Sequence, residues 1–341
     1  MGFFDSFRRD KKDQQEKKEE VKDVSRETSA EPEEPQKEVE PEEPQTTSEV
    51  VTAMNAEVVE REVAPQKEIV PTPIRTYEDK KPVTHAIGTT KIIAIINQKG
   101  GVGKSTTAIN LSAALGELGK QVLLVDLDPQ GNTTSGLGVE KGELSNCIYN
   151  VLLEDLPIEK VIIPDVCEGL DLVPATINLA GAEVELVSEM ARENRLKEAV
   201  GSMRGKYDYV FIDCPPSLGL LTVNSLVAAD KLIIPIQTEF YALEGVTKLL
   251  ESMKRVKNRL NPTLDIFGIL LTMYDGRTTL SRQVAMEVRN YFGRQVFETV
   301  IPRTVKLSEA PSYGIPITQY DPQGKGAISY TELAKEVVKR G

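Results

Sequence analysis

The feature that most constrains the fold is a glycine-rich segment between an apolar run and a helix-forming stretch. The apolar run is Ile92–Asn97 and the expected helix is Ser105–Leu118; between them the chain reads Gln98-Lys99-Gly100-Gly101-Val102-Gly103-Lys104-Ser105-Thr106. Glycines let a backbone wrap around a phosphate, its N–H groups point inward, and the helix N-terminus adds the positive end of its dipole. Lys104 would then neutralise β- and γ-phosphate charge, and the Ser105 hydroxyl would ligate Mg²⁺. The segment predicts a phosphate-binding loop.

Beyond this loop, apolar runs alternate with helical patterns. The alternation predicts an α/β domain over residues 88–341, with a mostly parallel twisted sheet and helices on both faces. The expected strands are Ile92–Asn97, Val122–Asp126, Leu170–Val173, Tyr209–Asp213, Leu232–Ile236, Ile266–Met273 and Val296–Ile301. The expected helices are Ser105–Leu118, Asn178–Val200, Ala242–Arg259, Leu280–Phe292 and Ala327–Lys339.

Three aspartates stand at the ends of predicted strands. Asp126 and Asp128 follow the run 122–125, and Asp213 ends the run 209–213. A parallel sheet gathers functional groups at its carboxyl edge, so we expect all three side chains to converge on the phosphate loop. Asp213 fits the Walker B role, in which the carboxylate holds Mg²⁺ through water. Aspartates at strand ends also cap turns, so a structural role remains the alternative, above all for Asp126.

The loop departs from the usual G-x-x-x-x-G-K-[ST] pattern. Gln98 stands where the first glycine belongs, and an additional lysine, Lys99, precedes Lys104 by five residues. This arrangement resembles the deviant Walker A motif of the ParA/MinD group of P-loop ATPases. The resemblance implies Mg²⁺-dependent ATP hydrolysis by an ATP-dependent homodimer, in which Lys99 reaches the partner's nucleotide. It also implies that Asp128 positions or activates the attacking water and that Asp126 supports the nucleotide-dependent switch. The ATP-binding residues would be Lys99, Gly100, Gly101, Val102, Gly103, Lys104, Ser105 and Thr106.

Three longer segments, residues 126–138, 271–278 and 301–312, resemble the chromosomal ParA (Soj) subgroup, and the resemblance spans residues 90–340. It implies a sandwich dimer that binds double-stranded DNA without sequence preference. A ParB-type partner would stimulate hydrolysis and release the DNA, which drives chromosome or plasmid segregation. The same resemblance places Met273, Pro302, Arg303 and Thr304 around the adenine. It assigns DNA contacts to Arg277 and Lys306, where the family more often has arginine at the second position.

Charge supports the location of the DNA contacts independently. Residues 251–306 hold ten basic and five acidic side chains, although the chain as a whole has a net charge of −11. Arg282 and Arg289 are seven residues apart on the expected helix 280–292 and share a face, whereas Val284, Val288 and Phe292 can face the core. A basic patch can track DNA phosphates by counterion release. A merely solvated face is the alternative for Arg282 and Arg289.

The N-terminal quarter differs from the rest. Residues 10–87 are rich in Glu, Lys and Pro, which predicts a disordered acidic tail. In residues 1–9, Phe3, Phe4 and Phe7 share one helical face and precede basic residues, as in a short amphipathic element that docks on a partner or a membrane surface. No apolar run reaches membrane-spanning length and no secretory signal is visible, so we expect a cytoplasmic protein. The resemblance to the chromosomal ParA subgroup implies in addition that it is associated with the nucleoid.

Composition excludes several classes of chemistry. The one histidine, His85, lies in the predicted tail, so the folded part has no histidine base or ligand. Cys147, Cys167 and Cys214 have no CxxC spacing, and the pattern does not match the cysteines that iron proteins of this fold use to hold a shared cluster. The main alternative function is a MinD-like ATPase that positions a membrane or polar assembly. Against it, the chain ends with its last predicted helix and adds no further amphipathic one.

Overall fold

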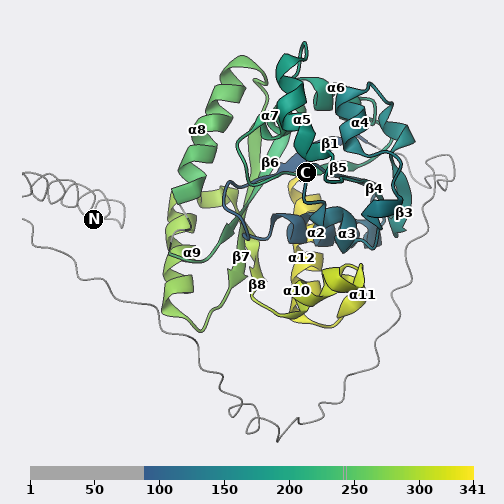
Figure 1. Ribbon diagram of the computed structural model, residues 1–341. Coiled ribbons are helices and arrows are strands. Elements are labelled where there is room, and N and C mark those ends of the chain that lie inside the picture. The colour runs from purple at the N-terminus through teal and green to yellow at the C-terminus, as the bar shows by residue number, and fades with distance from the viewer. Residues whose placement is uncertain (1–87, 241, 243) are drawn as a thin grey trace, which may run out of the picture. The chain divides into compact units, whose positions relative to one another are not determined.

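The computed structural model describes residues 88–240, 242 and 244–341, so the predicted docking element 1–9 and tail 10–87, with His85, lie outside the described residues. Eight strands form one sheet in the order β3-β4-β2-β5-β1-β6-β7-β8 (Figure 1). All pairs are parallel except β3 with β4, which confirms the mostly parallel sheet. The strands are β1 Lys91–Ile95, β2 Val122–Asp126, β3 Ile163–Cys167, β4 Leu170–Val173, β5 Tyr209–Asp213, β6 Lys231–Gln237, β7 Asp265–Tyr274 and β8 Val296–Pro302.

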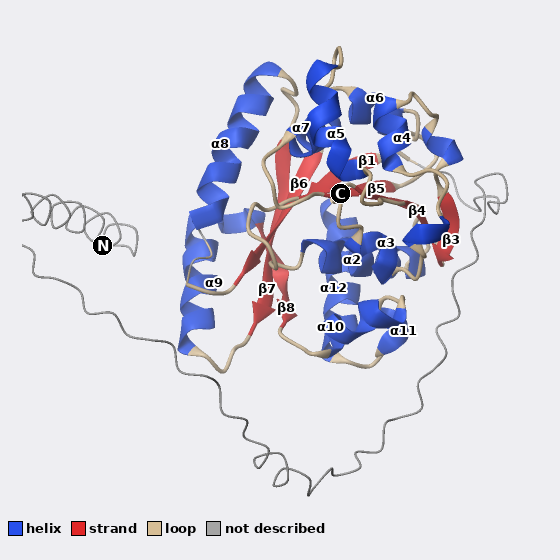
Figure 2. Cartoon of the chain, viewed as in Figure 1, coloured by secondary structure: helices blue, strands red, loops and turns tan. Residues whose placement is uncertain are grey.

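Helices cover both faces of the sheet (Figure 2). They are α2 Lys104–Glu117, α3 Asn132–Gly136, α4 Ile148–Leu153, α5 Leu179–Glu185, α6 Arg195–Gly201, α7 Leu220–Ala228, α8 Glu244–Arg259, α9 Thr279–Phe292, α10 Lys306–Glu309, α11 Ile317–Tyr320 and α12 Lys325–Arg340. Side chains of β1 alternate between two apolar clusters, as the strand period requires. One cluster packs under α4–α9 and the other under α2, α11 and α12. Among the described residues no helix is both long enough and apolar enough to span a membrane.

The predicted helix Asn178–Val200 is wrong as one continuous element. The chain forms α5, a short 3-10 turn at Leu186–Ser188, and then α6. Tertiary contacts hold the break: the Arg195 guanidinium lies 2.7 Å from Glu189, and the Asn224 amide side chain bonds both to Arg192 O (2.8 Å) and to Leu196 N (3.2 Å). These contacts satisfy the backbone groups that a longer helix would have paired. Helical periodicity in the sequence gives no sign of them.

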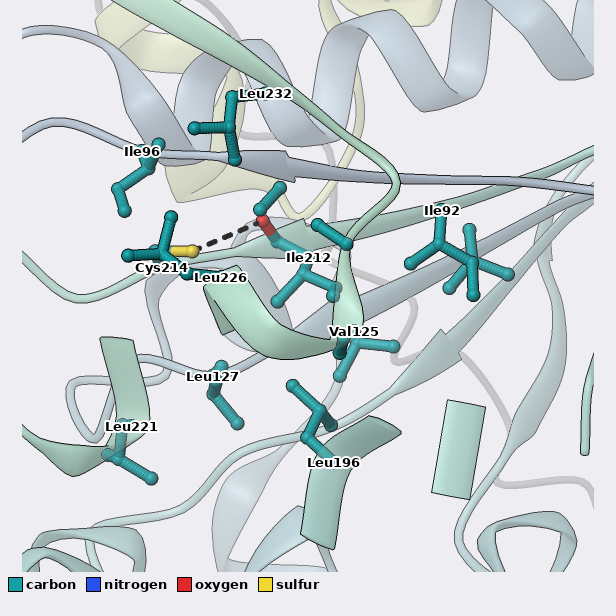
Figure 3. Packing of buried hydrophobic residues seen from close by; sticks show 14 of the residues in the cluster. Ile92, Ile96, Val125, Leu127, Leu196, Ile212, Cys214, Leu221, Leu226 and Leu232 are labelled. Carbon is teal, nitrogen blue, oxygen red and sulfur yellow. Dashed lines mark hydrogen bonds between the residues drawn. The ribbon is translucent and has the colours of Figure 1, made fainter. Parts of the chain in front are cut away.

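The strand β3 and the helices α3, α4, α7, α10 and α11 were not predicted. The edge strand β3 runs antiparallel, and its Pro164 is tolerated at a sheet edge. Helix α7 starts shortly after Asp213 and covers the core below the strand ends, where Ile92, Ile96, Ile212 and Cys214 pack together (Figure 3). Burial raises the pKa of Cys214 to about 12, so its thiol is a protonated core group that donates a weak bond to Ile212 O at 3.7 Å. This packing fixes the end of β5, and with it Asp213.

Candidate nucleotide-binding site

The predicted phosphate loop connects β1 to α2 and is open toward solvent. Gly101 and Gly103 have φ of 73° and 87°, in the left-handed region that favours glycine, and Gly103 caps α2. A Cβ added at Gly100 or Gly101 would meet nothing within 4 Å. The loop therefore presents open backbone at its centre, which is what a bound phosphate needs. Its base is held by Thr272, whose hydroxyl donates to Val102 O at 2.8 Å.

The two lysines of the loop occupy different environments. Lys104 is buried, and its Nζ donates to Lys99 O at 3.3 Å. Burial lowers the pKa of Lys104, while the nearby Asp213 and Asp128 act in the opposite direction. The Lys99 ammonium instead lies at the half-exposed rim, 3.7 Å from a carboxylate oxygen of Glu239. Lys104 thus points into the loop, and Lys99 is held at its mouth.

Asp213 lies at the carboxyl end of β5 with one free carboxylate oxygen. Its Oδ2 accepts a hydrogen bond from the Thr133 hydroxyl at 2.7 Å, whereas the buried Oδ1 has no hydrogen-bond partner among the described residues. Burial raises the pKa of Asp213, and the Ser105 and Thr133 hydroxyls and the Lys104 ammonium partly oppose this. An unpaired buried acceptor is costly and needs a partner.

Asp126 pairs in register with Asp213, but its carboxylate is fully engaged. Oδ2 accepts bonds from the Thr134 backbone N (2.8 Å) and hydroxyl (2.7 Å), and Oδ1 accepts one from Asp128 N (3.2 Å). Asp126 therefore anchors the start of α3, which is the turn-capping arrangement set out above as the alternative. Asp128 is buried beside it, accepts a bond from Gln130 N at 3.0 Å and contributes to the electrostatics of Lys104.

These residues fit a magnesium–nucleotide complex. The Ser105 hydroxyl is the kind of oxygen ligand that Mg²⁺ prefers, and the unpaired Asp213 oxygen can accept a bond from a water on the metal. The open glycine backbone and the buried Lys104 ammonium suit the phosphates. Val102 is buried and Thr106 is half-buried, so of the two only Thr106 keeps surface for a ligand. The predicted site residues of the loop therefore come together with Asp213 and Asp128 at one edge of the sheet.

The four residues predicted around the adenine lie at the ends of β7 and β8. Pro302 pairs in register with Tyr274, and Arg303 N donates to Tyr274 O at 3.2 Å. Met273 has φ of 51°, a strained value for a side chain of this size. Arg303 and the half-buried Thr304 follow directly on β8.

Sequence reasoning missed Glu239 and Thr272. The Glu239 carboxylate lies between Lys99 and the Arg303 guanidinium, which is 4.0 Å away, and accepts a bond from the Gln237 amide. It follows β6 as the aspartates follow β2 and β5, so the strand-end rule would have found it. No local signal marks Thr272, because its contact with Val102 is 170 residues distant along the chain.

The predicted DNA-contact residues lie on the β7–α9 side and on α10. Arg277 is 90% exposed and binds Asp275 in a two-point contact, with Nε–Oδ1 at 2.9 Å and Nη2–Oδ2 at 2.8 Å. Lys306 lies 3.0 Å from Glu309 and over the Tyr320 ring. Both cations thus have an acidic neighbour on the same protomer.

Helix α9 carries the other two predicted DNA contacts. Arg282 and Arg289 are exposed on it, while Val288 and Phe292 face the core, as the helical spacing predicts.

Comparisons with known proteins identify the family. A protein-family model described as an AAA domain matches residues 90–266. The sporulation initiation inhibitor protein Soj of Bacillus subtilis is 56% identical over 251 residues, which cover 74% of this chain and 99% of that protein. The chromosome partitioning protein ParA of Myxococcus xanthus is 53% identical over 73% of this chain and 88% of its own length.

Similar solved structures support the same family. One described as cobyrinic acid a,c-diamide synthase from Mycobacterium smegmatis, with bound ADP and magnesium, is 42% identical with a TM-score of 0.65 and covers 73% of this chain and 94% of that one. The septum site-determining protein MinD of Pyrococcus horikoshii, complexed with Mg-ADP, is 31% identical with a TM-score of 0.62 over 73% of this chain and 96% of that one. On the sequence match and the shared fold together, the chain belongs to the ParA/MinD-type P-loop ATPases, in the chromosomal ParA (Soj) subgroup.

Proposed function

We propose that this chain is an ATP-dependent DNA-partitioning switch. The relative named as the chromosome partitioning protein ParA of Myxococcus xanthus supports the partitioning function, and structures of similar proteins with nucleotide and magnesium support Mg²⁺ and ATP as its ligands. The observation that carries the catalytic part is the buried, unpaired Oδ1 of Asp213 beside Ser105 and Lys104. In this proposal residues 88–341 are the ATPase domain, preceded by a tail (10–87) and a docking element (1–9).

The residues divide the work of phosphoryl transfer, which needs positioning and charge neutralisation more than covalent chemistry. Mg²⁺, when bound, supplies positive charge at the phosphates, and Ser105 and Asp213 would hold it, Asp213 through water. Lys104 fixes the phosphates from inside the loop. Asp128 orients the attacking water, and the Asp126 anchor keeps the following α3 switch in place for it. Lys99 leaves Glu239 to reach the nucleotide of a second copy, so that hydrolysis needs the dimer.

DNA binding would use the exposed cations of the β7–α9 side and of α10. Arg277, Lys306, Arg282 and Arg289 can each neutralise a phosphate without reading a base, which suits binding without sequence preference. Each of these ion pairs joins an exposed cation to a half-buried carboxylate, Asp275 or Glu309. Such pairs are of modest strength, so a phosphate can replace the carboxylate. A ParB-type activator would then trigger hydrolysis and release, and the protein would reside on the nucleoid in the cytoplasm.

Co-sedimentation of the full chain with unrelated duplex DNA and, in parallel, with anionic liposomes tests the proposal. We expect DNA binding with ATP but not ADP, lost in Lys99→Ala and weakened in Arg277→Ala, and no liposome binding. ATP turnover measured with and without a ParB-type protein tests the activation step. Liposome binding that disappears when Phe3–Phe7 are deleted, together with no DNA binding, would instead establish a MinD-like ATPase on a membrane.

A further inference from the structure

A continuous chain of hydrogen bonds joins the phosphate loop to Arg277. It begins where the Thr272 hydroxyl donates to Val102 O (2.8 Å). Thr238, directly after β6, then donates through its backbone N to Thr272 O (3.1 Å) and lies with its hydroxyl 3.3 Å from Met273 O. In Figure 1 β6, which Thr238 follows, and β7, which contains Thr272 and Met273, lie side by side, and β7 leads into α9.

The second half of the chain runs from α9 to the surface. The Ser281 hydroxyl, in the first turn of α9, donates to the Thr238 hydroxyl at 2.7 Å and accepts a bond from Asp275 N at 3.1 Å. The Asp275 carboxylate then holds Arg277 through its backbone N, Nε and Nη2. Each of the three hydroxyls, of Thr272, Thr238 and Ser281, donates a single hydrogen bond in this series, so all the hydrogen bonds of the series can form at the same time.

The middle of this hydrogen-bond chain is buried. Thr272, Thr238 and Ser281 are 2%, 4% and 4% exposed, so their hydroxyls cannot exchange these partners for water at no cost. The Ser281 hydroxyl, as donor to Thr238 and acceptor from Asp275, fixes where the loop 275–278 begins. The position of Arg277 therefore depends on groups that also touch the phosphate loop.

A strained residue lies at the junction. Met273, with φ of 51°, sits between Thr272 and Tyr274, where the register of β7 with β8 shifts. A non-glycine residue in this conformation persists because surrounding contacts hold it, and such strain tends to gather at ligand clamps and switches. The Thr238 hydroxyl approaches both carbonyls of the Thr272–Met273 segment, at 3.4 and 3.3 Å. Among the hydrogen-bonded residues named above, Thr238 is thus the one that contacts both the strained segment and α9.

We propose that Thr238 is a positioning residue that couples the nucleotide state of the phosphate loop to the DNA-contact surface, through Thr272 on one side and Ser281 and Asp275 on the other. This coupling rests on the proposed function. A change in the loop at Val102 alters the Thr272 contact, and the Thr238 hydroxyl passes it to the start of α9 and to Arg277. Asp275 would then hold Arg277 in one nucleotide state and release it to DNA in the other.

Thr238→Val in the full chain tests this, since valine keeps the shape and removes the hydroxyl. The ratio of DNA affinities with ATP and ADP should fall by about tenfold, which is within the usual range of coupling between two sites. ATP affinity, measured with a fluorescent analogue, should stay as in the unchanged chain. Thr238→Ser should restore the ratio. Ser281→Ala breaks the chain one step farther from the loop and should lower the ratio in the same way.

Thr90→Val is the matched control. Thr90 is equally buried and its hydroxyl donates to Tyr207 O, but it directly precedes β1 and so lies at the amino ends of the strands, away from the phosphate loop. It should leave the ratio unchanged. A Thr238→Val ratio equal to that of the unchanged chain would overturn the coupling while leaving DNA binding established.

Hydrogen exchange of the amides of residues 275–281, with ADP and with a non-hydrolysable ATP analogue, gives a readout without DNA. Nucleotide-dependent protection that is lost in Thr238→Val supports the coupling, even if the unchanged chain binds no DNA and the proposed function fails. Exchange that does not depend on nucleotide in the unchanged chain would overturn the coupling.

Discussion

Asp126 and Asp213 face each other as register partners at the carboxyl ends of β2 and β5, and both side chains are fully buried. They differ in what their oxygens contact. Thr134 and Asp128 donate hydrogen bonds to both oxygens of the Asp126 carboxylate, whereas one oxygen of Asp213 has no hydrogen-bond partner among the described residues. Burial, and then the charge of Asp213, raise the pKa of Asp126. Two neighbouring buried carboxylates therefore destabilise the site until a cation offsets their charge.

Removing the Asp213 charge should stabilise the nucleotide-free protein. An aspartate whose pKa is raised on folding loses folding free energy when it ionises, so the cost is absent below pH 3.8 and complete above about pH 6. We expect Asp213→Asn to unfold at a higher temperature than the unchanged chain at pH 8, by a few degrees, and to lose Mg²⁺-dependent ATP hydrolysis. The difference in unfolding temperature should shrink as the pH falls toward 4.

Asp275→Asn is a control, because the contribution of Asp275 to stability has the opposite sign from that of Asp213. Arg277 lowers the pKa of Asp275 to about 2, so its small stabilising effect is present above pH 3.8 and is lost as the pH falls toward 2. This variant should show no stabilisation at pH 8. Equal unfolding temperatures for Asp213→Asn and the unchanged chain at pH 8 would contradict the electrostatic account of the site.

Replacing each of the two loop lysines with glutamine should impair a different step, ATP binding for Lys104 and hydrolysis for Lys99. Lys104→Gln removes a buried ammonium and should abolish ATP binding measured by fluorescence titration. Lys99 has only a half-exposed contact with Glu239, worth about 0–1 kcal/mol, so Lys99→Gln should leave stability and ATP binding nearly unchanged and abolish hydrolysis. Full ATPase activity in Lys99→Gln would rule out a role for this lysine in the partner's site.

Charge variants at the β7–α9 loop should move DNA affinity in opposite directions. Arg277→Ala removes about one phosphate contact, so the slope of log affinity against log salt should fall by about 1. Asp275→Asn frees Arg277 from its two-point contact and should tighten DNA binding. Fluorescence anisotropy with a labelled duplex, titrated over a salt series, measures both. Weaker binding in Asp275→Asn would show that Asp275 presents Arg277 to DNA instead of competing with the phosphate.

Thr134 should be the residue of α3 most sensitive to loss of its hydroxyl. That hydroxyl donates to Asp126 and accepts a bond from Ala175 N at 2.9 Å, and all these groups are buried. Thr134→Val should lower the free energy of unfolding by about 1–3 kcal/mol, because it leaves a buried N–H and a carboxylate short of partners. Urea denaturation measures the loss. Thr134→Ser, which keeps the hydroxyl, should recover most of it, and equal losses in both variants would assign the effect to packing.

Much of the fold could be predicted from the amino-acid sequence. Seven strands, the phosphate loop and helices α2, α8, α9 and α12 were predicted within a few residues, because continuous apolar runs and the period-3.6 apolar spacing of helices are local properties of sequence. The gathering of Asp128 and Asp213 at the loop followed from the rule that parallel strands share a carboxyl edge. The motifs also identified the family, since the residues proposed to hold phosphate are consecutive along the chain.

Tertiary structure decided the rest. Four features depend on which distant segments of the chain meet. Both Asp126 oxygens accept hydrogen bonds while one Asp213 oxygen accepts none from the described residues, and the stretch 178–200 breaks into two helices. Asp275 holds Arg277, and Thr238 connects Thr272 with Ser281. Sheet order brings Val102 to Thr272, and helix packing brings Ser281 to Thr238. A local pattern fixes which side of an element is buried, but the partner of each buried polar group is fixed only when the elements pack.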